Sequence, residues 1–192
     1  MYSIPTSVDI DGKEYKIRNN GDYRMVLDCF SALNDTELNT EERLFASLII
    51  FYEDMDEYSM ESLNLEVAVN KMFDFFNCGS TDQNAKKVPY KLLDWDKDSQ
   101  LICSAVNKVA NTEIRLVPYM HWWTFMGYYS AIGECLLSTI LTIRDKIMKG
   151  KKLEKYEREF RRDNPQYFVW NSKTLEQEEA DKLIAEMWNS GD

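Results

Sequence analysis

Three aspartates at alternating positions are the residues of this sequence that most resemble a metal-ligand set. Asp94, Asp96 and Asp98 lie in the stretch DWDKD, and D-x-D-x-D opens the calcium loop of an EF-hand. That loop also needs glycine at its sixth position and a bidentate glutamate at its twelfth. Those positions hold Ser99 and Ala105. We therefore interpret the aspartates as a helix start, with Asp96 or Asp94 as N-cap and acidic residues in the first turn.

The chain has one histidine, His121, directly before Trp122 and Trp123. A zinc site built on histidines is excluded because no second histidine exists. Catalytic groups are concentrated on loops and element ends, whereas His121 is expected on a helix that is apolar nearly all round. We therefore predict a packed imidazole with a hydrogen-bonded ring nitrogen. A cysteine–histidine nucleophile pair stays open, since such partners meet in space rather than in sequence.

Other chemical signals are weak. Four scattered cysteines, without any C-x-x-C pair, indicate neither a zinc ribbon nor a redox dithiol, and we expect reduced, mostly buried thiols. The sequence contains no H-E-x-x-H, G-x-S-x-G or P-loop motif, and no spacing marks two carboxylates as general acid and base. The N-terminus lacks the layout of a signal peptide. These observations predict a protein that is not an enzyme and has no cofactor and no metal.

The net charge of −10 argues against binding to nucleic acid or to an anionic membrane, because phosphate groups demand a positive surface. The longest apolar region, about 128–143, is interrupted by Glu134, and a membrane span needs about 20 apolar residues. We therefore expect neither nucleic acid nor a membrane among the partners.

The charge is unevenly distributed. Residues 144–163 hold nine basic and five acidic residues, a local net of +4, whereas residues 174–192 hold six acids and one lysine, a net of −5. In the basic segment the pairs Glu154–Arg158 and Glu157–Arg161 have helical i,i+4 spacing, which predicts a solvated, salt-bridged face. Phosphate binding is the alternative. The two opposite charges also suggest that neighbouring copies join head to tail.

The elements that position these residues are mostly helices. The segment VDIDGKEYKI alternates apolar and polar residues around Asp11-Gly12, which predicts a β-hairpin with a tight turn. Periodicity and capping signals predict a mainly α fold of about seven helices. Thr40 is the expected N-cap of the second helix, and Asn164-Pro165 is expected to end the basic one. The expected helices lie near 22–32, from the Thr40 cap through Tyr52, from Leu65 to a stop at Gly79, 97–110, 118–132 with 134–147 as a hairpin partner or bent continuation, a basic helix in 144–163, and 175–188.

Pro118 is expected to open the tryptophan-rich helix, and helix 118–132 is expected to be the buried centre. We predict one helical domain over 1–172, with a loop or internal boundary at 79–89, and an acidic amphipathic helix over 173–192. Trp170 is expected to dock on the domain. The last helix carries the stripe Leu183, Ile184, Met187 and Trp188, which we predict to bind a partner.

Four segments in order resemble the bacteriophage gene-product-fifteen family of siphophages and of prophages in Gram-positive bacteria. They are DIDGKEYKI, DWDKDSQLICSAVNK, YMHWWTFMGYYSAI and IRDKIMKGKKLEKYEREFRRDNPQY. The resemblance covers about residues 5–170. Its most specific part is DWD, followed by an apolar helix and then HWW. The last helix lies outside it.

The resemblance implies a tail-assembly chaperone in the host cytoplasm. Such a protein would coat the tape-measure protein, recruit tail-tube subunits and then leave, alone or with a companion chaperone, as a monomer or a homo-oligomer. The alternative is a structural tail or connector component that stays in the virion. The family carries no established catalytic residues, which favours His121 and its two tryptophans as core.

Overall fold

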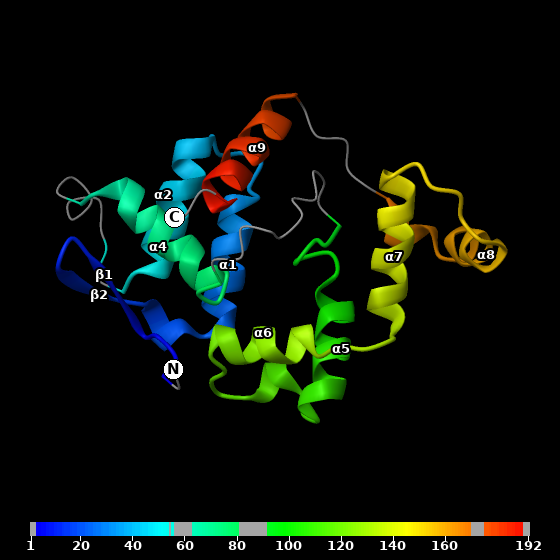
Figure 1. The fold of residues 1–192 in the computed structure, drawn as a ribbon, viewed down its shortest axis with the longest axis horizontal. Coiled ribbons are helices and arrows are strands. Elements are labelled where there is room, and N and C mark those ends of the chain that lie inside the picture. The colour runs from blue at the N-terminus through cyan, green and yellow to red at the C-terminus, as the bar shows by residue number, and fades with distance from the viewer. Residues whose placement is uncertain (1–2, 54, 56–62, 81–91, 170–174, 190–192) are drawn as a thin grey trace. The chain divides into compact units, whose positions relative to one another are not determined.

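A computed structural model describes residues 3–53, 55, 63–80, 92–169 and 175–189. It confirms a mainly helical protein with an N-terminal two-stranded antiparallel hairpin, and 8 α-helices lie within these residues (Figure 1). The strands are β1 (Ser7–Ile10) and β2 (Lys13–Lys16). The helices are α1 (Tyr23–Leu33), α2 (Thr40–Phe51), α4 (Leu65–Phe76), α5 (Ser99–Ala110), α6 (Trp122–Ser130), α7 (Leu136–Met148), α8 (Lys155–Asp163) and α9 (Leu175–Asn189).

Short 3-10 turns complete the described structure: η1 (Arg18–Gly21), η2 (Ile114–Leu116) and η3 (Pro165–Phe168). None of the helices in these ranges combines the length and the apolar composition that a bilayer crossing requires.

The predicted hairpin is present. Val8 pairs with Tyr15 in antiparallel register, and the turn residues Asp11 and Gly12 have φ angles of 52° and 83°. Two successive positive φ angles match the right-handed twist of the flanking strands. Strand β1 lies against α4, which gives the apolar face of this marginal element a partner.

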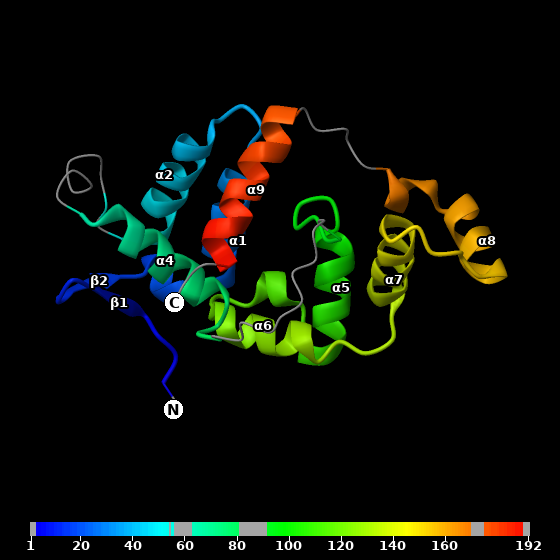
Figure 2. The ribbon, with the colours of Figure 1, turned by 45° about the horizontal axis from the view of Figure 1, so that its top comes forward.

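The chain divides into two compact units, each built from separate stretches of sequence. Unit 1 comprises Met1–Ala85, Val117–Gly127 and Thr174–Asp192, and unit 2 comprises Lys86–Leu116 and Tyr128–Lys173. Helix α9 therefore belongs with the hairpin, α1, α2 and α4 (Figure 2). The domain limits expected from the sequence, 1–172 and 173–192, stay a prediction. The predicted loop at 79–89 falls mostly on residues 81–91, outside the described ranges.

Aromatic rings fill the core of unit 1. Phe30 of α1 meets Trp122 of α6 edge to face, with ring centroids 5.7 Å apart, and Phe51 of α2 meets Phe76 of α4 in the same manner at 5.7 Å. Such pairs contribute about 0.5–1.5 kcal/mol each beyond the area that they bury. The aromatic residues of four helices thereby hold unit 1 together.

Aliphatic residues fill the core of unit 2, where α5 and α7 lie side by side. Both helices bury residues at the three- and four-residue spacing of a single helical face. The buried residues are Ile102, Ala105 and Val106 on α5, and Leu137, Ile140 and Ile143 on α7.

Helix α2 begins at Thr40, and its N-cap lies one residue earlier than expected. Asn39 is the N-cap: its Oδ1 accepts the backbone N–H of Glu42 at 3.0 Å, and Glu42 Oε2 accepts the N–H of Asn39 at 2.8 Å. This reciprocal pair is a capping box. The assignment of Thr40 as N-cap was wrong because the neighbouring asparagine makes both bonds.

Helix α6 begins at Trp122 and not at Pro118. The residues before it are extended, because the Tyr23 N–H donates to the Met120 carbonyl at 2.9 Å and the Met120 N–H donates to Asp22 Oδ2 at 3.0 Å. This pairing with the start of α1 replaces the first helical turn that proline was expected to open. Within α6 only Trp122 and Phe125 are buried, so the prediction of a helix buried nearly all round was wrong.

The basic segment 144–163 forms two helices rather than one. Helix α7 ends at Met148, and Gly150 adopts a φ of 63°, a left-handed conformation that glycine adopts without steric cost. Helix α8 then begins at Lys155 and ends at Asp163, so the predicted stop at Asn164-Pro165 is confirmed.

Candidate functional site

His121 lies just before α6 and is 2% exposed. Its Nε2 is 2.9 Å from the Pro5 carbonyl oxygen, and its Nδ1 accepts the backbone N–H of Trp123 at 3.1 Å. A neutral imidazole has one donor and one acceptor nitrogen, so we assign the proton to Nε2. Burial lowers the pKa of His121 from its ordinary value, against the opposing effects of the Pro5 carbonyl and Asp22. The ring is neutral at pH 7 and uses both nitrogens.

The two tryptophans cap the C-terminal end of α4. Trp122 Nε1 donates to the Phe76 carbonyl at 2.9 Å, and Trp123 Nε1 donates to the Phe75 carbonyl at 2.9 Å. The last carbonyls of a helix have no partner within it. The adjacent indoles thus satisfy two of these acceptors while one of them, Trp122, also fills the core at 1% exposure.

Close packing against the imidazole requires glycine at the last residue of η1, Gly21. Gly21 has a φ of 76°, and a Cβ there would lie 2.7 Å from Phe75 Cζ and 2.9 Å from His121 Nε2. Only glycine fits a left-handed position against a ring. His121, Trp122 and Trp123, hereafter the HWW cluster, therefore join α1, α4 and α6 as structural contacts, in agreement with the predicted packed imidazole.

The environments of Cys29 and Cys78 do not favour a thiolate that could pair with His121. All four are free thiols; Cys29 is buried, whereas Cys78, Cys103 and Cys135 are half-buried, which corrects the expectation that most are buried. Burial raises the pKa of Cys29 strongly and that of Cys78 to about 11. A thiol with a raised pKa is a poor nucleophile at pH 7. Since both nitrogens of His121 bind backbone groups, the cysteine–histidine pair left open by the sequence has no free base.

The DWD segment forms a turn before α5. Asp94 Oδ1 accepts the backbone N–H groups of Asp96 and Lys97 at 3.1 Å each, an aspartate turn. Helix α5 starts later than expected, at Ser99, and its N-cap is Asp98, so both Asp94 and Asp96 were wrong as caps. The side chain of Asp98 does not cap the helix; it turns into unit 2.

Asp98 forms a buried ion pair with Arg144 of α7. The two guanidinium nitrogens Nη1 and Nη2 lie 2.5 and 2.9 Å from the two carboxylate oxygens. The side chain of Arg144 is 8% exposed and that of Asp98 is 3% exposed. Arg144 also donates to the carbonyls of Leu92 and Tyr167. This bidentate geometry is the strong form of the arginine–carboxylate interaction.

Sequence reasoning missed this ion pair. Arg144 was read as the first residue of a basic surface, whereas it lies four residues after Ile140 on the apolar face of α7. An arginine on the apolar face of a helix could have indicated a buried ion pair, since a buried cation requires an acidic partner. Within the described part of the chain, no group of three or more histidine, cysteine or acidic side chains is placed to hold a metal ion.

A pocket of about 320 Å³ lies between α7 and α8. Its lining is mostly polar: Glu134, Ser138, Thr139, Thr142, Ile143, Tyr156 and Glu157. Glu157 is 1% exposed and binds Lys146 Nζ at 2.6 Å and the Glu154 N–H at 2.7 Å. The hydrogen bond from Lys146 lowers the pKa of Glu157. A carboxylate held ionised by such contacts stabilises structure and is unsuited to act as a general acid.

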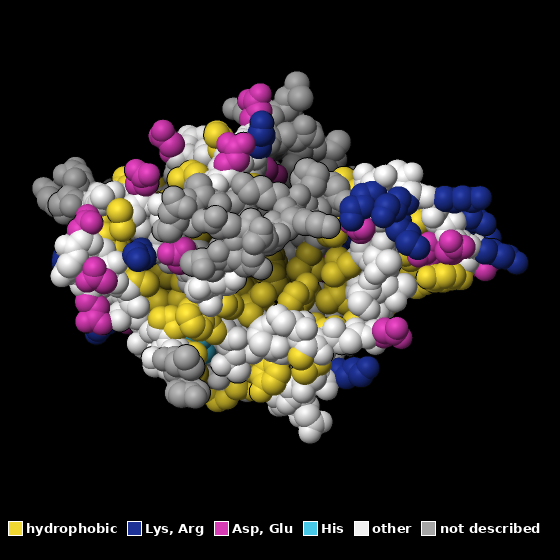
Figure 3. Space-filling view, in the orientation of Figure 1, with side chains coloured by type: hydrophobic (Ala, Val, Ile, Leu, Met, Phe, Trp, Pro, Cys, Tyr) yellow, Lys and Arg dark blue, Asp and Glu magenta, His cyan; other side chains and the backbone are white. Residues whose placement is uncertain are grey.

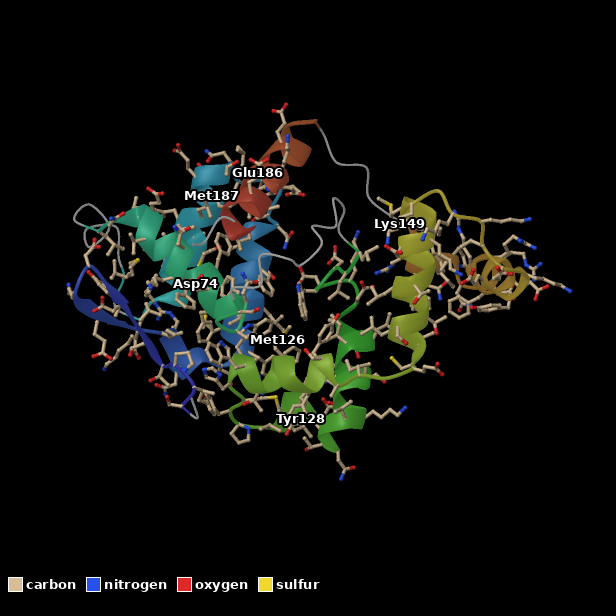
Figure 4. The ribbon with its side chains drawn as sticks, in the orientation of Figure 1. Asp74, Met126, Tyr128, Lys149, Glu186 and Met187 are labelled. Carbon is tan, nitrogen blue, oxygen red and sulfur yellow. The ribbon has the colours of Figure 1, made fainter. Side chains whose placement is uncertain are left out.

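The predicted partner-binding stripe divides between the interior and the surface of unit 1. Ile184 is 7% exposed and Leu183 is 51% exposed, while Met187 is half-buried; Figure 4 shows Met187 beside Glu186 on α9. The side chain of Trp188 and all of Trp170 lie outside the described structure. The role of the stripe in binding stays a prediction.

These contacts define a helical protein whose conspicuous polar residues hold secondary structure together. Residues 2–168 match the family model described as Bacteriophage Gp15 protein. The chain therefore belongs to this phage protein family, as its four sequence segments suggested. The match includes the HWW cluster and the Asp98–Arg144 pair and ends before α9. Neither the curated proteins nor the solved structures gave a match to the chain.

Proposed function

We propose that this protein is a non-enzymatic tail-assembly chaperone of a phage, acting in the host cytoplasm. It binds the tape-measure protein, the tail-tube protein or both, with or without a companion chaperone, and leaves before the tail is complete. The observation that carries the proposal is the match of residues 2–168 to the phage family. The engagement of His121, Asp98 and Glu157 in internal contacts supports a role in binding rather than in catalysis.

Helix α9 offers the most specific binding surface for such a client. Ile184 anchors the helix in unit 1, whereas Leu183, its neighbour in sequence, is half exposed. An amphipathic helix with an apolar residue on its outer side is a common partner for another helix. We therefore assign Leu183 to client contact and Ile184 to the attachment of α9.

Capture of the two clients tests this function. The full chain is co-expressed with the tape-measure protein or with the tail-tube protein of the same phage, and the complexes are isolated. Leu183→Asp should reduce capture by about tenfold, corresponding to about 1.4 kcal/mol. Ala185→Asp, which adds the same charge at another exposed position of α9, is the matched control. Capture of neither client by the wild-type chain would refute the function, whereas full capture by Leu183→Asp would refute only the assigned surface.

Mass spectrometry of purified virions separates the chaperone from the structural alternative. A chaperone that leaves is absent from the particle, whereas a tail or connector component is present in stoichiometric copies. Abundant copies in purified virions would replace the chaperone by the structural role.

A further inference from the structure

The outer side of α8 and the turn before it form a surface with an excess of positive charge, in which exposed cations outnumber the exposed acids Glu154, Glu159 and Asp163. Besides Arg162, which pairs with Asp163, five cations are exposed there, and we call them the basic face: Lys151, Lys152, Lys155, Arg158 and Arg161. Within the described residues, none of the five lies in a salt bridge. Dark blue side chains gather over α8 and the end of α7, where Lys149 lies (Figures 3 and 4).

The two acids that were expected to pair with cations of this face, Glu154 and Glu157, are engaged elsewhere. Glu157, four residues before Arg161, is buried and is occupied by Lys146 and the Glu154 N–H. Arg158 Nη1 donates to the Leu153 carbonyl at 2.6 Å instead of pairing with Glu154. The two expected i,i+4 pairs, Glu154–Arg158 and Glu157–Arg161, therefore do not form, whereas other acids of the segment do make salt bridges within it: Lys149–Asp145, Lys146–Glu157 and Arg162–Asp163.

The complementary charge is carried by the other unit of the same chain. Unit 1 holds 7 basic and 23 acidic residues, a net of −16, whereas unit 2 holds 16 basic and 10 acidic residues, a net of +6. Four exposed acids of unit 1 fall within residues 35–42: Asp35, Glu37, Glu41 and Glu42. The nearest base in sequence, Arg43, is 1% exposed and so adds no positive charge to that surface.

We propose that the basic face of one copy docks on the acidic unit 1 of a second copy. The contact joins two different surfaces, so a bound pair keeps one free acidic surface and one free basic face and can add further copies. Tyr156, the neighbour of Lys155 in sequence, is 62% exposed and adds apolar area to this face. The net charge of −10 disfavours a nucleic acid in this place, since a polyanion is repelled by the rest of the chain.

Sedimentation velocity of the full chain, without any client, tests the contact. From about 0.01 M to 1 M salt the screening length falls from about 30 to 3 Å, so oligomers at low salt should dissociate at high salt. Lys152→Glu/Lys155→Glu reverses two cations near the start of α8, where acidic residues suit the helix dipole. This variant should fold normally and associate at least about tenfold more weakly, because two attractions become repulsions. Lys97→Glu/Lys108→Glu, with the same change in charge on unit 2, should associate as the wild type.

A mixing experiment establishes which surface the basic face meets. The variant Glu37→Lys/Glu41→Lys keeps its basic face and, alone, should likewise associate at least about tenfold more weakly than the wild type. Mixed with Lys152→Glu/Lys155→Glu, it should form a complex of one copy of each variant and nothing larger, since only one intact pair of surfaces remains. A monomeric wild-type chain at low salt would overturn the proposal, as would association that both variants leave unchanged. Binding of a labelled oligonucleotide by a chain that does not self-associate would assign the face to phosphate instead. Failure of self-association leaves client capture, the test of the proposed function, unaffected.

Discussion

Arg43 of α2 and Asp181 of α9 form an ion pair across 3.2 Å, with the arginine side chain 2% and the aspartate side chain 30% exposed. The arginine belongs to the part of the chain that matches the phage family, whereas the aspartate lies beyond it. Arg43 Nε also donates to the Leu38 carbonyl at 2.9 Å. This ion pair thus ties α9 to α2. Within the described residues, Asp181 is the carboxylate that pairs with the buried guanidinium of Arg43.

Asp181→Asn should therefore destabilise unit 1 by about 1–3 kcal/mol, because a hydrogen bond to a buried charge is lost. Urea unfolding followed by circular dichroism measures the effect. Glu186→Gln removes an exposed acid from the same helix and should change the free energy of unfolding by less than about 0.5 kcal/mol. Equal effects of the two substitutions would show that Arg43 does not depend on Asp181.

His121→Ala should lower the free energy of unfolding by about 1–3 kcal/mol, since the Pro5 carbonyl and the Trp123 N–H lose their partner in a buried place. It should also flatten the pH dependence of stability. The pKa of His121 in the folded protein lies below the ordinary 6.5, so the unfolded chain binds more protons below about that pH. The wild type should lose stability as the pH falls through the folded pKa of His121. An equally steep loss in His121→Ala would show that other groups cause it.

Asp98→Asn should destabilise unit 2 by about 3–5 kcal/mol, because the substitution leaves the Arg144 guanidinium buried without its anion. Arg144→Lys should not keep the wild-type stability of unit 2, since an ammonium group cannot bind both carboxylate oxygens as the planar guanidinium does. Directly after the same helix, Lys149 pairs with Asp145 at the surface with 44% of its side chain exposed. Lys149→Ala should cost no more than about 1 kcal/mol. Thermal unfolding of the three variants distinguishes the buried from the exposed pair.

Gly127→Ala should raise the free energy of unfolding by up to about 1 kcal/mol, because alanine is the better helix former. Gly127 lies inside α6, and an added Cβ meets nothing within 4 Å. Gly21→Ala should have the opposite effect, since Gly21 combines a φ of 76° with a Cβ position 2.7 Å from Phe75. Melting temperatures of the two variants should therefore shift in opposite directions; shifts of the same sign would contradict the packing around His121.

Local signals in the sequence placed most of the helices. The apolar spacing from Leu65 to Phe76 predicted a helix, and α4 spans these residues, although it ends before the expected stop at Gly79; the Asp11-Gly12 turn predicted the hairpin in the same way. The prediction for the tryptophan-rich helix was wrong because a distant segment offered a better partner. Residues 118–121 became extended because Asp22 and Tyr23, about a hundred positions earlier, supply the hydrogen bonds of Met120.

The sequence by itself determined the fold class, the hairpin, the family and the interior place of the imidazole, because propensity, periodicity and motif order depend on residues close together in the chain. Tertiary structure alone decided that Asp98 pairs with Arg144, that two indoles cap α4, and that Glu157 is withdrawn from the cations of α8. Each of these depends on which buried polar groups compete for one partner. That competition involves residues far apart in sequence, so no local pattern reveals its result.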